Sequence, residues 1–149
     1  MAIIILLIIV VGIGYFISQM ISSDANKSVS QSYSSNGFKE IKIDVPPGYD
    51  YLSFNIAGTS FRRGLNKYVG EFDGQLVADP KNPYDKNAIK IIHEDGHHLG
   101  FIPADETDEV REFLPLPCEC HGILVRGKDE NDGHVFYYGT VVIVKKQST

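Results

Sequence analysis

The hydrophobic and polar positions divide the chain into three stretches with different patterns. Residues 2–21 contain no charged side chain and consist mostly of isoleucine, leucine and valine. Residues 22–37 are rich in serine, asparagine and glutamine. From Phe38 onward, short runs of alternating apolar and polar residues are separated by glycine, proline, asparagine and aspartate. This order predicts a membrane segment, a linker and one folded domain.

The uncharged N-terminal stretch is long enough to cross a bilayer. Twenty residues of α-helix at about 1.5 Å per residue reach about 30 Å, which is the thickness of the hydrocarbon core. We therefore predict a transmembrane anchor over residues 1–22, inserted through residues 2–21. A cleaved secretory signal is the alternative, with Ser23-Asp24-Ala25 as a weak cleavage site. Such a signal carries a positively charged start, and here no lysine or arginine precedes the apolar run.

The residues after the anchor predict its orientation and a tether. Lys27, Lys39 and Lys42 follow the apolar run, whereas no lysine or arginine precedes it. The positive-inside rule then places the C-terminal domain in the cytoplasm, as the soluble part of a single-pass membrane protein. The polar residues 23–37 cannot bury enough surface to form a core, so we expect a flexible linker there.

Residues 38–149 are too few for more than one core and predict a single, mainly β domain. Alternation with a period of two predicts strands over residues 38–45, 51–57, 71–78, 88–93, 97–102, 118–126 and 134–144. One helix is expected over residues 104–114, where Val110, Phe113 and Leu114 follow helical spacing. Many short strands, turn signals and one or two short helices are typical of a small β-barrel.

The densest local signal is a polar turn, Asp79–Ile89, that leads directly into a predicted strand. Asn82 precedes a proline, a pair that favours turn initiation. Asp85 and Asn87 have short side chains that can hydrogen-bond to nearby backbone amides. Taken alone, these residues describe a surface turn whose polar groups are satisfied locally.

Two further blocks flank this turn and give it a context. Upstream, Asn55–Gly64 contains a glycine, an aromatic residue and two arginines; downstream, Gly96–Pro103 contains Leu-Gly-Phe-Ile-Pro. The three blocks, in this order, resemble the HIRAN family, small modules best known at the front of DNA-remodelling ATPases of the SWI/SNF type. The resemblance covers about residues 50–147 and implies a β-barrel of OB-like shape.

The resemblance also implies a ligand, because HIRAN modules of eukaryotic remodelling ATPases bind single-stranded DNA and capture its 3′-hydroxyl end. It implies that Asn82 and Asp85 hold the terminal nucleotide and that Phe61 stacks on a base. Phosphate contacts would come from the two arginines beside Phe61. The full candidate set for nucleic-acid binding is Phe61, Arg62, Arg63, Asn82, Tyr84, Asp85, Lys86, Phe101 and Phe136.

The chain departs from the pattern of its DNA-binding relatives at several of these positions. Ser60 replaces a basic residue before the stacking aromatic, and Arg62 replaces a second aromatic. After the strand, Phe101 and Ala104 replace a histidine and a lysine. The polar part of the site is therefore retained only in part.

The charge balance limits how much nucleic acid the domain can coat. Of the charged residues only Asp24 and Lys27 precede Phe38, so the whole net charge of −5 falls on the domain. Basic residues nevertheless cluster around the candidate site, while acids concentrate in residues 105–112. A confined basic patch on an acidic body favours recognition of an end over coating of a long strand.

Enzymatic activity and metal binding find little support. The chain has no G-x-x-x-x-G-K-[ST] phosphate loop and no serine or cysteine in a nucleophile motif, so we expect no catalysis. Cys118, Cys120 and His121 are weak zinc candidates: in a strand the two cysteines share a face and His121 points away. No cofactor is therefore expected.

The sequence thus predicts a membrane-anchored module that binds nucleic acid, as single-stranded DNA or its 3′ ends, without catalysis. The alternative is a membrane-tethered module for a protein or peptide partner that has lost DNA binding. Small barrels serve both purposes, so fold alone does not separate the two hypotheses.

Overall fold

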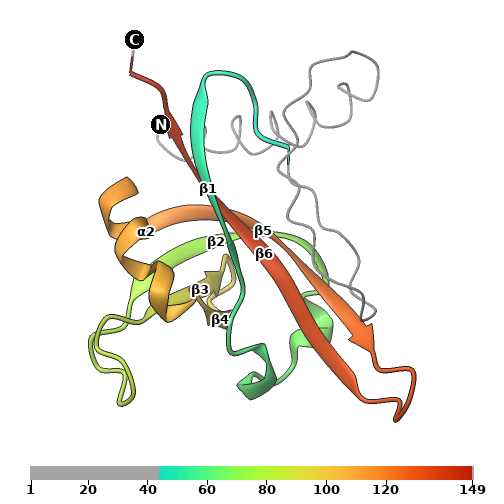
Figure 1. Cartoon of the computed structure of the whole chain (residues 1–149). Coiled ribbons are helices and arrows are strands. Elements are labelled where there is room, and N and C mark those ends of the chain that lie inside the picture. Colours follow the sequence, from blue (N-terminus) through green and yellow to red (C-terminus); the bar gives the residue numbers. More distant parts are fainter. Residues whose placement is uncertain (1–43, 149) are drawn as a thin grey trace, which may run out of the picture.

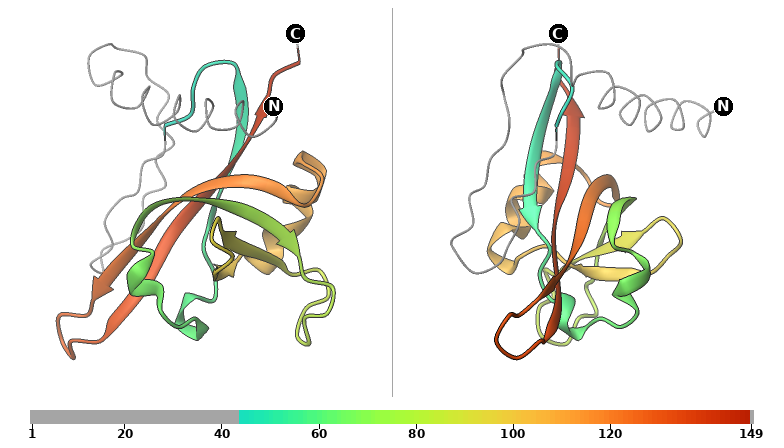
Figure 2. Two further views of the ribbon diagram at one scale, coloured as in Figure 1. Left: turned by 180° about the vertical axis from the view of Figure 1, so that it is seen from behind. Right: turned by 90° about the vertical axis from the view of Figure 1, so that its right-hand side faces the viewer.

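The computed structural model describes residues 44–148, which form one six-stranded antiparallel sheet with the order β1-β6-β5-β2-β3-β4. The sheet curls strongly instead of lying flat (Figure 1), and β1 and the end of β6 project beyond it as a two-stranded ribbon (Figure 2). The strands are β1 (Tyr49–Asn55), β2 (Gly70–Ala78), β3 (Ile89–His93), β4 (His98–Phe101), β5 (Cys118–Lys128) and β6 (Val135–Lys146).

The core lies on the inner side of the curled sheet, because alternate residues of each strand point inward. Leu76, Ile91 and Leu124 are fully buried on β2, β3 and β5. Partner strands add further buried residues, among them Phe54, Leu99, Val141 and Ile143. The alternation that predicted the strands therefore also predicts the side that is buried.

Two hairpins join neighbouring strands at the predicted glycine turns. Gly96 lies in the short loop between β3 and β4 with a φ of 93°, and the N–H of His93 donates to the carbonyl of His97 at 2.9 Å. Gly133 adopts a φ of 73° between β5 and β6. Both loops need a residue that tolerates positive φ, which glycine does without steric cost.

The two edges of the sheet meet just beyond β1. The N–H of Ala57 donates to the carbonyl of Phe101 at 2.8 Å, and the N–H of Phe101 donates back to Ala57 at 2.9 Å. Gly100 permits this approach, because a Cβ atom there would lie 2.6 Å from the carbonyl oxygen of Ala57. The sheet is thus a half-barrel whose edges are joined at one bridge.

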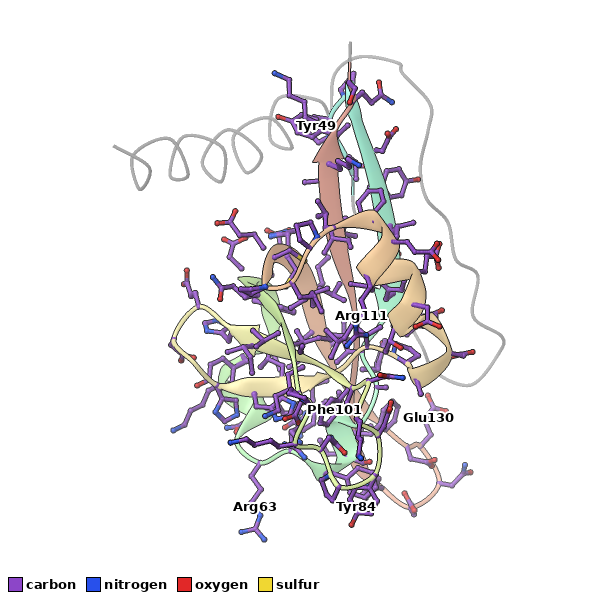
Figure 3. All side chains as sticks on the ribbon, turned by 90° about the vertical axis from the view of Figure 1, so that its left-hand side faces the viewer. Tyr49, Arg63, Tyr84, Phe101, Arg111 and Glu130 are labelled. Atoms are coloured by element: carbon purple, nitrogen blue, oxygen red, sulfur yellow. The ribbon has the colours of Figure 1, made fainter. Side chains whose placement is uncertain are left out.

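A short helix follows β4 and supports the polar turn. The 3₁₀ turn η4 (Ala104–Glu106) leads into α2 (Thr107–Phe113), which packs through the buried Val110. Arg111, labelled in Figure 3, donates from Nη1 to the carbonyl of Asn87 at 3.0 Å. The helix therefore fixes the end of the turn that leads into β3.

The mainly β class with one short helix is confirmed. The predicted OB-like barrel is present as a curled half-barrel whose edges are joined at one bridge. The strand predicted over residues 38–45 is wrong at its end, because Asp44 and Val45 are not in a strand. Its remaining residues, like the predicted anchor (1–22) and linker (23–37), lie outside the described residues. Within residues 44–148, no helix has the length and apolar character needed to cross a membrane.

Candidate nucleic-acid interface

Most of the candidate residues come from two loops that lie at the same end of the molecule, whereas Phe101 lies on β4 and Phe136 on β6. One loop carries the 3₁₀ turns η2 (Thr59–Phe61) and η3 (Leu65–Lys67), and the other is the polar turn between β2 and β3. Figure 3 shows Arg63 and Tyr84 at this end, opposite Tyr49, with Phe101 above them. Figure 1 shows the two loops at the lower end of the molecule, spaced apart across it.

The polar turn is held by its own side chains. The Oδ1 atom of Asn82 accepts hydrogen bonds from the backbone N–H groups of Tyr84, at 2.9 Å, and of Asp85, at 3.1 Å. Asp85 in turn accepts from the N–H of Asn87 at 2.8 Å, through its own Oδ1. Asn82 therefore organises the turn through its oxygen. Its Nδ2 donates one hydrogen to Oδ2 of Asp79 at 3.4 Å, and the second hydrogen is the donor left for a ligand.

A salt bridge joins the start of this turn to β3. The Nζ atom of Lys90 lies 3.2 Å from Oδ1 of Asp79, with about a third of the lysine side chain exposed. Lys90 is also the direct cross-strand partner of Phe101 on β4, so the two side chains share one face of the sheet. Lys90 is not among the residues predicted for the site, because the sequence does not show which residue lies opposite it on the neighbouring strand.

Arg62 lies on this same face, held between two side chains of β4. Its Nη1 atom lies 2.8 Å from Nδ1 of His98, and its Cζ atom lies 5.6 Å from the centroid of the Phe101 ring. The rings of His98 and Phe101 meet edge to face, with centroids 4.6 Å apart. Two positions that depart from the pattern of the DNA-binding relatives, Arg62 and Phe101, are thus in contact as a cation and a ring.

His98 is a further residue of the site, in contact with Arg62 and Phe101. Burial, together with the positive charge of Arg62, lowers the pKa of His98 below its ordinary value of 6.5. The carbonyl of Gly100 and the charge of Asp79 oppose this shift, while Lys90 adds to it. No local motif marks His98, because its partner Arg62 lies 36 residues away in the chain.

Two aromatic rings of the candidate set are exposed at the site. Phe61 is 80% exposed and Tyr84 is 97% exposed, so neither ring contributes to the core. Burying such a ring would be favourable, because aromatic side chains have large apolar faces. Arg63 and Lys86, next to these rings in the chain, are also exposed.

The loop that carries Phe61 and Arg62 is braced from two sides. The hydroxyl of Thr59 donates to the carbonyl of Tyr137 on β6 at 2.6 Å. At the other end, Nε2–H of His97 donates to the carbonyl of Arg63 at 3.0 Å, and the His97 ring stacks on Tyr68 with centroids 4.5 Å apart. These contacts fix the backbone on both sides of Arg62.

Phe136 belongs to the same β6 segment but lies against other residues. Its ring is 5.8 Å from that of Tyr138, and the ring packs over the backbone of Gly127, where a Cβ atom would lie 2.4 Å away. The residue between these two rings, Tyr137, is the one that accepts from Thr59. The role of Phe136 as a further stacking ring stays a prediction.

The weak metal candidates do not converge. Cys120 is buried and Cys118 packs against the core, and burial raises the pKa of both thiols. His121 points to the opposite face, where its Nδ1 lies 2.8 Å from Oδ1 of Asp73. Among residues 44–148, no group of three His, Cys, Asp or Glu side chains is placed to hold a metal ion.

Comparison with known proteins places this chain in a family. The crystal structure of the HIRAN domain of human HLTF is similar to this chain, with a TM-score of 0.42 and 21% sequence identity. That similarity covers 67% of this chain and 82% of the HLTF domain. No curated protein matches the chain. The sequence profile of the HIRAN domain matches residues 49–143, which include all the candidate site residues and more than half of the chain. This protein is a member of the HIRAN domain family.

Proposed function

We propose that this protein is a membrane-anchored HIRAN module that binds nucleic acid, with a preference for single-stranded DNA carrying a free 3′-hydroxyl, and that it has no catalytic step of its own. Membership of the HIRAN family suggests a DNA-binding module. The observation that carries the proposal is that two exposed rings and a cluster of cations lie at one end of the fold. Arg62 and Lys90 belong to that cluster, and Phe61 and Tyr84 are the rings.

The exposed rings suit single strands better than duplexes. Bases of a single strand are unstacked and can lie on an aromatic side chain, an interaction that contributes about 1–3 kcal/mol per base. Phe61 is 80% exposed without any packing role, which is what a stacking platform requires. A duplex hides the faces of its bases and would leave this ring unused.

The cations are few, and this favours recognition of a short segment. Lys90 is already paired with Asp79, so Arg62 and the exposed Arg63 and Lys86 are the main groups that can meet phosphates. The rest of the domain is acidic and repels a long polyanion. The salt dependence of binding should therefore correspond to about two or three neutralised phosphates.

Asp85 supports the preference for a 3′ end. One hydrogen bond, to the N–H of Asn87, occupies its Oδ1 atom. A carboxylate offers about four acceptor positions, so capacity remains for the hydroxyl of a terminal sugar. The same carboxylate would repel a phosphate placed there, which excludes an internal nucleotide or a 3′-phosphate from this position.

Fluorescence anisotropy with the full-length chain in detergent tests the proposal. Two 5′-labelled oligothymidylates are compared that differ only in the last sugar, 3′-hydroxyl against 3′-deoxy. We expect the free hydroxyl to bind about two- to tenfold more tightly, the effect of one hydrogen bond. Asp85→Asn, which keeps the backbone acceptor and removes the charge, is the matched variant for the same pair of strands.

Two results would contradict the proposal. Equal affinity for the two strands would leave a nucleic-acid module without end recognition. If neither strand binds at low salt and high micromolar protein, nucleic acid is excluded as the ligand. A protein or peptide partner would then become the better account.

A further inference from the structure

The contact between Arg62 and His98 fixes the protonation state of the histidine. An arginine side chain has only hydrogen-bond donors, so Nη1 of Arg62 donates and Nδ1 of His98 accepts, at 2.8 Å. The other ring nitrogen, Nε2, lies 2.9 Å from the carbonyl of Gly100 and therefore carries the proton. His98 is thus neutral, and both of its nitrogens are used.

The charged groups around His98 favour this neutral state. Arg62 from the η2–η3 loop and Lys90 from β3 face it with positive charge, and Asp79 at the end of β2 faces it with negative charge. Burial and the two cations outweigh the carboxylate, and the pKa of His98 is lowered as a result. At neutral pH the acceptor for Arg62 is therefore present.

The same contacts define which face of Arg62 a ligand can reach. The guanidinium lies over Phe101 and is held at Nη1, while its Nε atom is buried and lacks a hydrogen-bond partner among the described residues. The donors left for a ligand are the second hydrogen of Nη1 and the two hydrogens of Nη2. Donors of Nη1 and Nη2 together can form a fork that fits two oxygens of a phosphate.

We propose that His98 is a positioning residue, which holds Arg62 in the orientation that presents this fork to a backbone phosphate of the bound strand. The inference rests on the proposed function, because it assigns a positioning residue to the same nucleic-acid site. It also makes the site sensitive to acid: a protonated His98 loses its acceptor and repels Arg62, so the guanidinium leaves its place over Phe101. The fork is then no longer preorganised.

Replacement of His98 separates positioning from mere packing. His98→Asn keeps an acceptor near the place of Nδ1 and cannot take up a proton, whereas His98→Leu keeps bulk and loses the acceptor. With the full-length chain and the 3′-hydroxyl oligothymidylate at about pH 7.5, we expect His98→Leu to weaken binding about five- to tenfold and His98→Asn to stay within about twofold. Equal losses in the two variants would overturn the proposal.

A double-mutant cycle with Arg62→Ala tests whether His98 acts through the arginine. Once Arg62 is absent, His98→Leu should weaken binding no further. A loss of the same size with and without Arg62 would mean that His98 contacts the ligand or supports the fold independently, and the positioning role would be wrong.

The pH profile distinguishes a positioning residue from a second cation. The affinity of the wild type is divided by that of His98→Asn at each pH, so that all other titrating groups cancel. We expect this ratio to fall as the pH is lowered from about 7.5 to about 5.5, because only the wild type loses its acceptor. A ratio that rises would show that protonated His98 attracts the phosphate directly, contrary to the proposal.

A measurement without DNA keeps this inference separate from the proposed function. In ¹⁵N NMR spectra of the free protein, His98 should be the neutral Nε2–H tautomer, and Arg62→Ala should raise its pKa. If this coupling is present but no strand binds, the nucleic-acid function fails. If strands bind but the coupling is absent, the positioning of Arg62 by His98 fails.

Discussion

Asn82 holds Asp85 through a hydrogen bond from the backbone N–H of Asp85 to the side-chain oxygen of Asn82, 3.1 Å long. The same oxygen accepts from Tyr84, so one side chain shapes the segment that presents both an exposed ring and a carboxylate. In this turn, the same residues hold the backbone and supply the proposed ligand contacts. Variants must therefore distinguish an effect on stability from an effect on binding.

Removing the carboxylate of Asp85 should destabilise the domain. We expect Asp85→Ala to lower the free energy of unfolding by about 1–2 kcal/mol, because the N–H of Asn87 loses its acceptor. Asp85→Asn keeps this acceptor and should stay close to the wild type in chemical denaturation. Identical denaturation curves for Asp85→Ala and the wild type would show that the turn does not depend on this bond.

Removing the ring of Phe61 should affect binding and leave stability unchanged. The side chain is 80% exposed, so Phe61→Ala should change the unfolding free energy by less than about 0.5 kcal/mol. Binding of every single strand should weaken by about 1–3 kcal/mol, since stacking is tolerant of sequence. Tyr49→Ala, at the opposite end of the molecule (Figure 3), is the control and should bind normally in the same titration.

Removing the charge of Arg62 should change the salt dependence. We expect the slope of log K against log salt to flatten by about 0.7 in Arg62→Ala, the value for one phosphate of a single strand. Lys146→Ala removes a positive charge beside Tyr49 and should keep the wild-type slope. An unchanged salt slope in Arg62→Ala would mean that Arg62 does not contact a phosphate of the strand.

The stability of the domain should depend on pH through His98. The pKa of His98 is lowered in the folded state, so below about pH 6.5 the unfolded chain takes up this proton first. The contribution of His98 is therefore complete above pH 6.5 and is lost as the pH falls toward the folded-state pKa. His98→Asn should show a shallower loss of melting temperature over this range. A steeper loss would mean that the sign is wrong.

The N-terminal residues predict how the protein fractionates. Residues 2–21 contain no charge, so the intact chain should stay with the membranes after a carbonate wash. Insertion of two arginines in the middle of this stretch is the control and should release the protein. Recovery of a soluble form that begins near Asn26 would identify a cleaved signal instead.

Local chemistry made the turns and strands predictable. Gly96 and Gly133 mark their hairpins in the sequence because positive φ is a property of one residue. Asn82 and Asp85 accept hydrogen bonds from backbone amides two or three positions away, so the turn could also be predicted from its sequence. The resemblance to the HIRAN family supplied two further predictions: that Phe61 stacks on a base and that the strands form an OB-like barrel.

Relations between distant residues could not be predicted in this way. Arg62 was expected to contact phosphate, but the ring and the imidazole that hold it come from β4, more than a loop and two strands later. Lys90 looked like an ordinary polar position of a strand until its register opposite Phe101 was known. A single sequence gives the alternation of a strand and does not give its partner.

The bridge between Ala57 and Phe101 links the shape of the domain to its dynamics. Two backbone hydrogen bonds join these residues, and Arg62 and the Phe101 ring lie directly beside them. Opening of this bridge would free the edge of β4 that carries Phe101, and with it the ring that lies under Arg62. A bound strand that spans the bridge would therefore slow amide hydrogen exchange at Ala57 and Phe101, even though neither N–H touches the ligand.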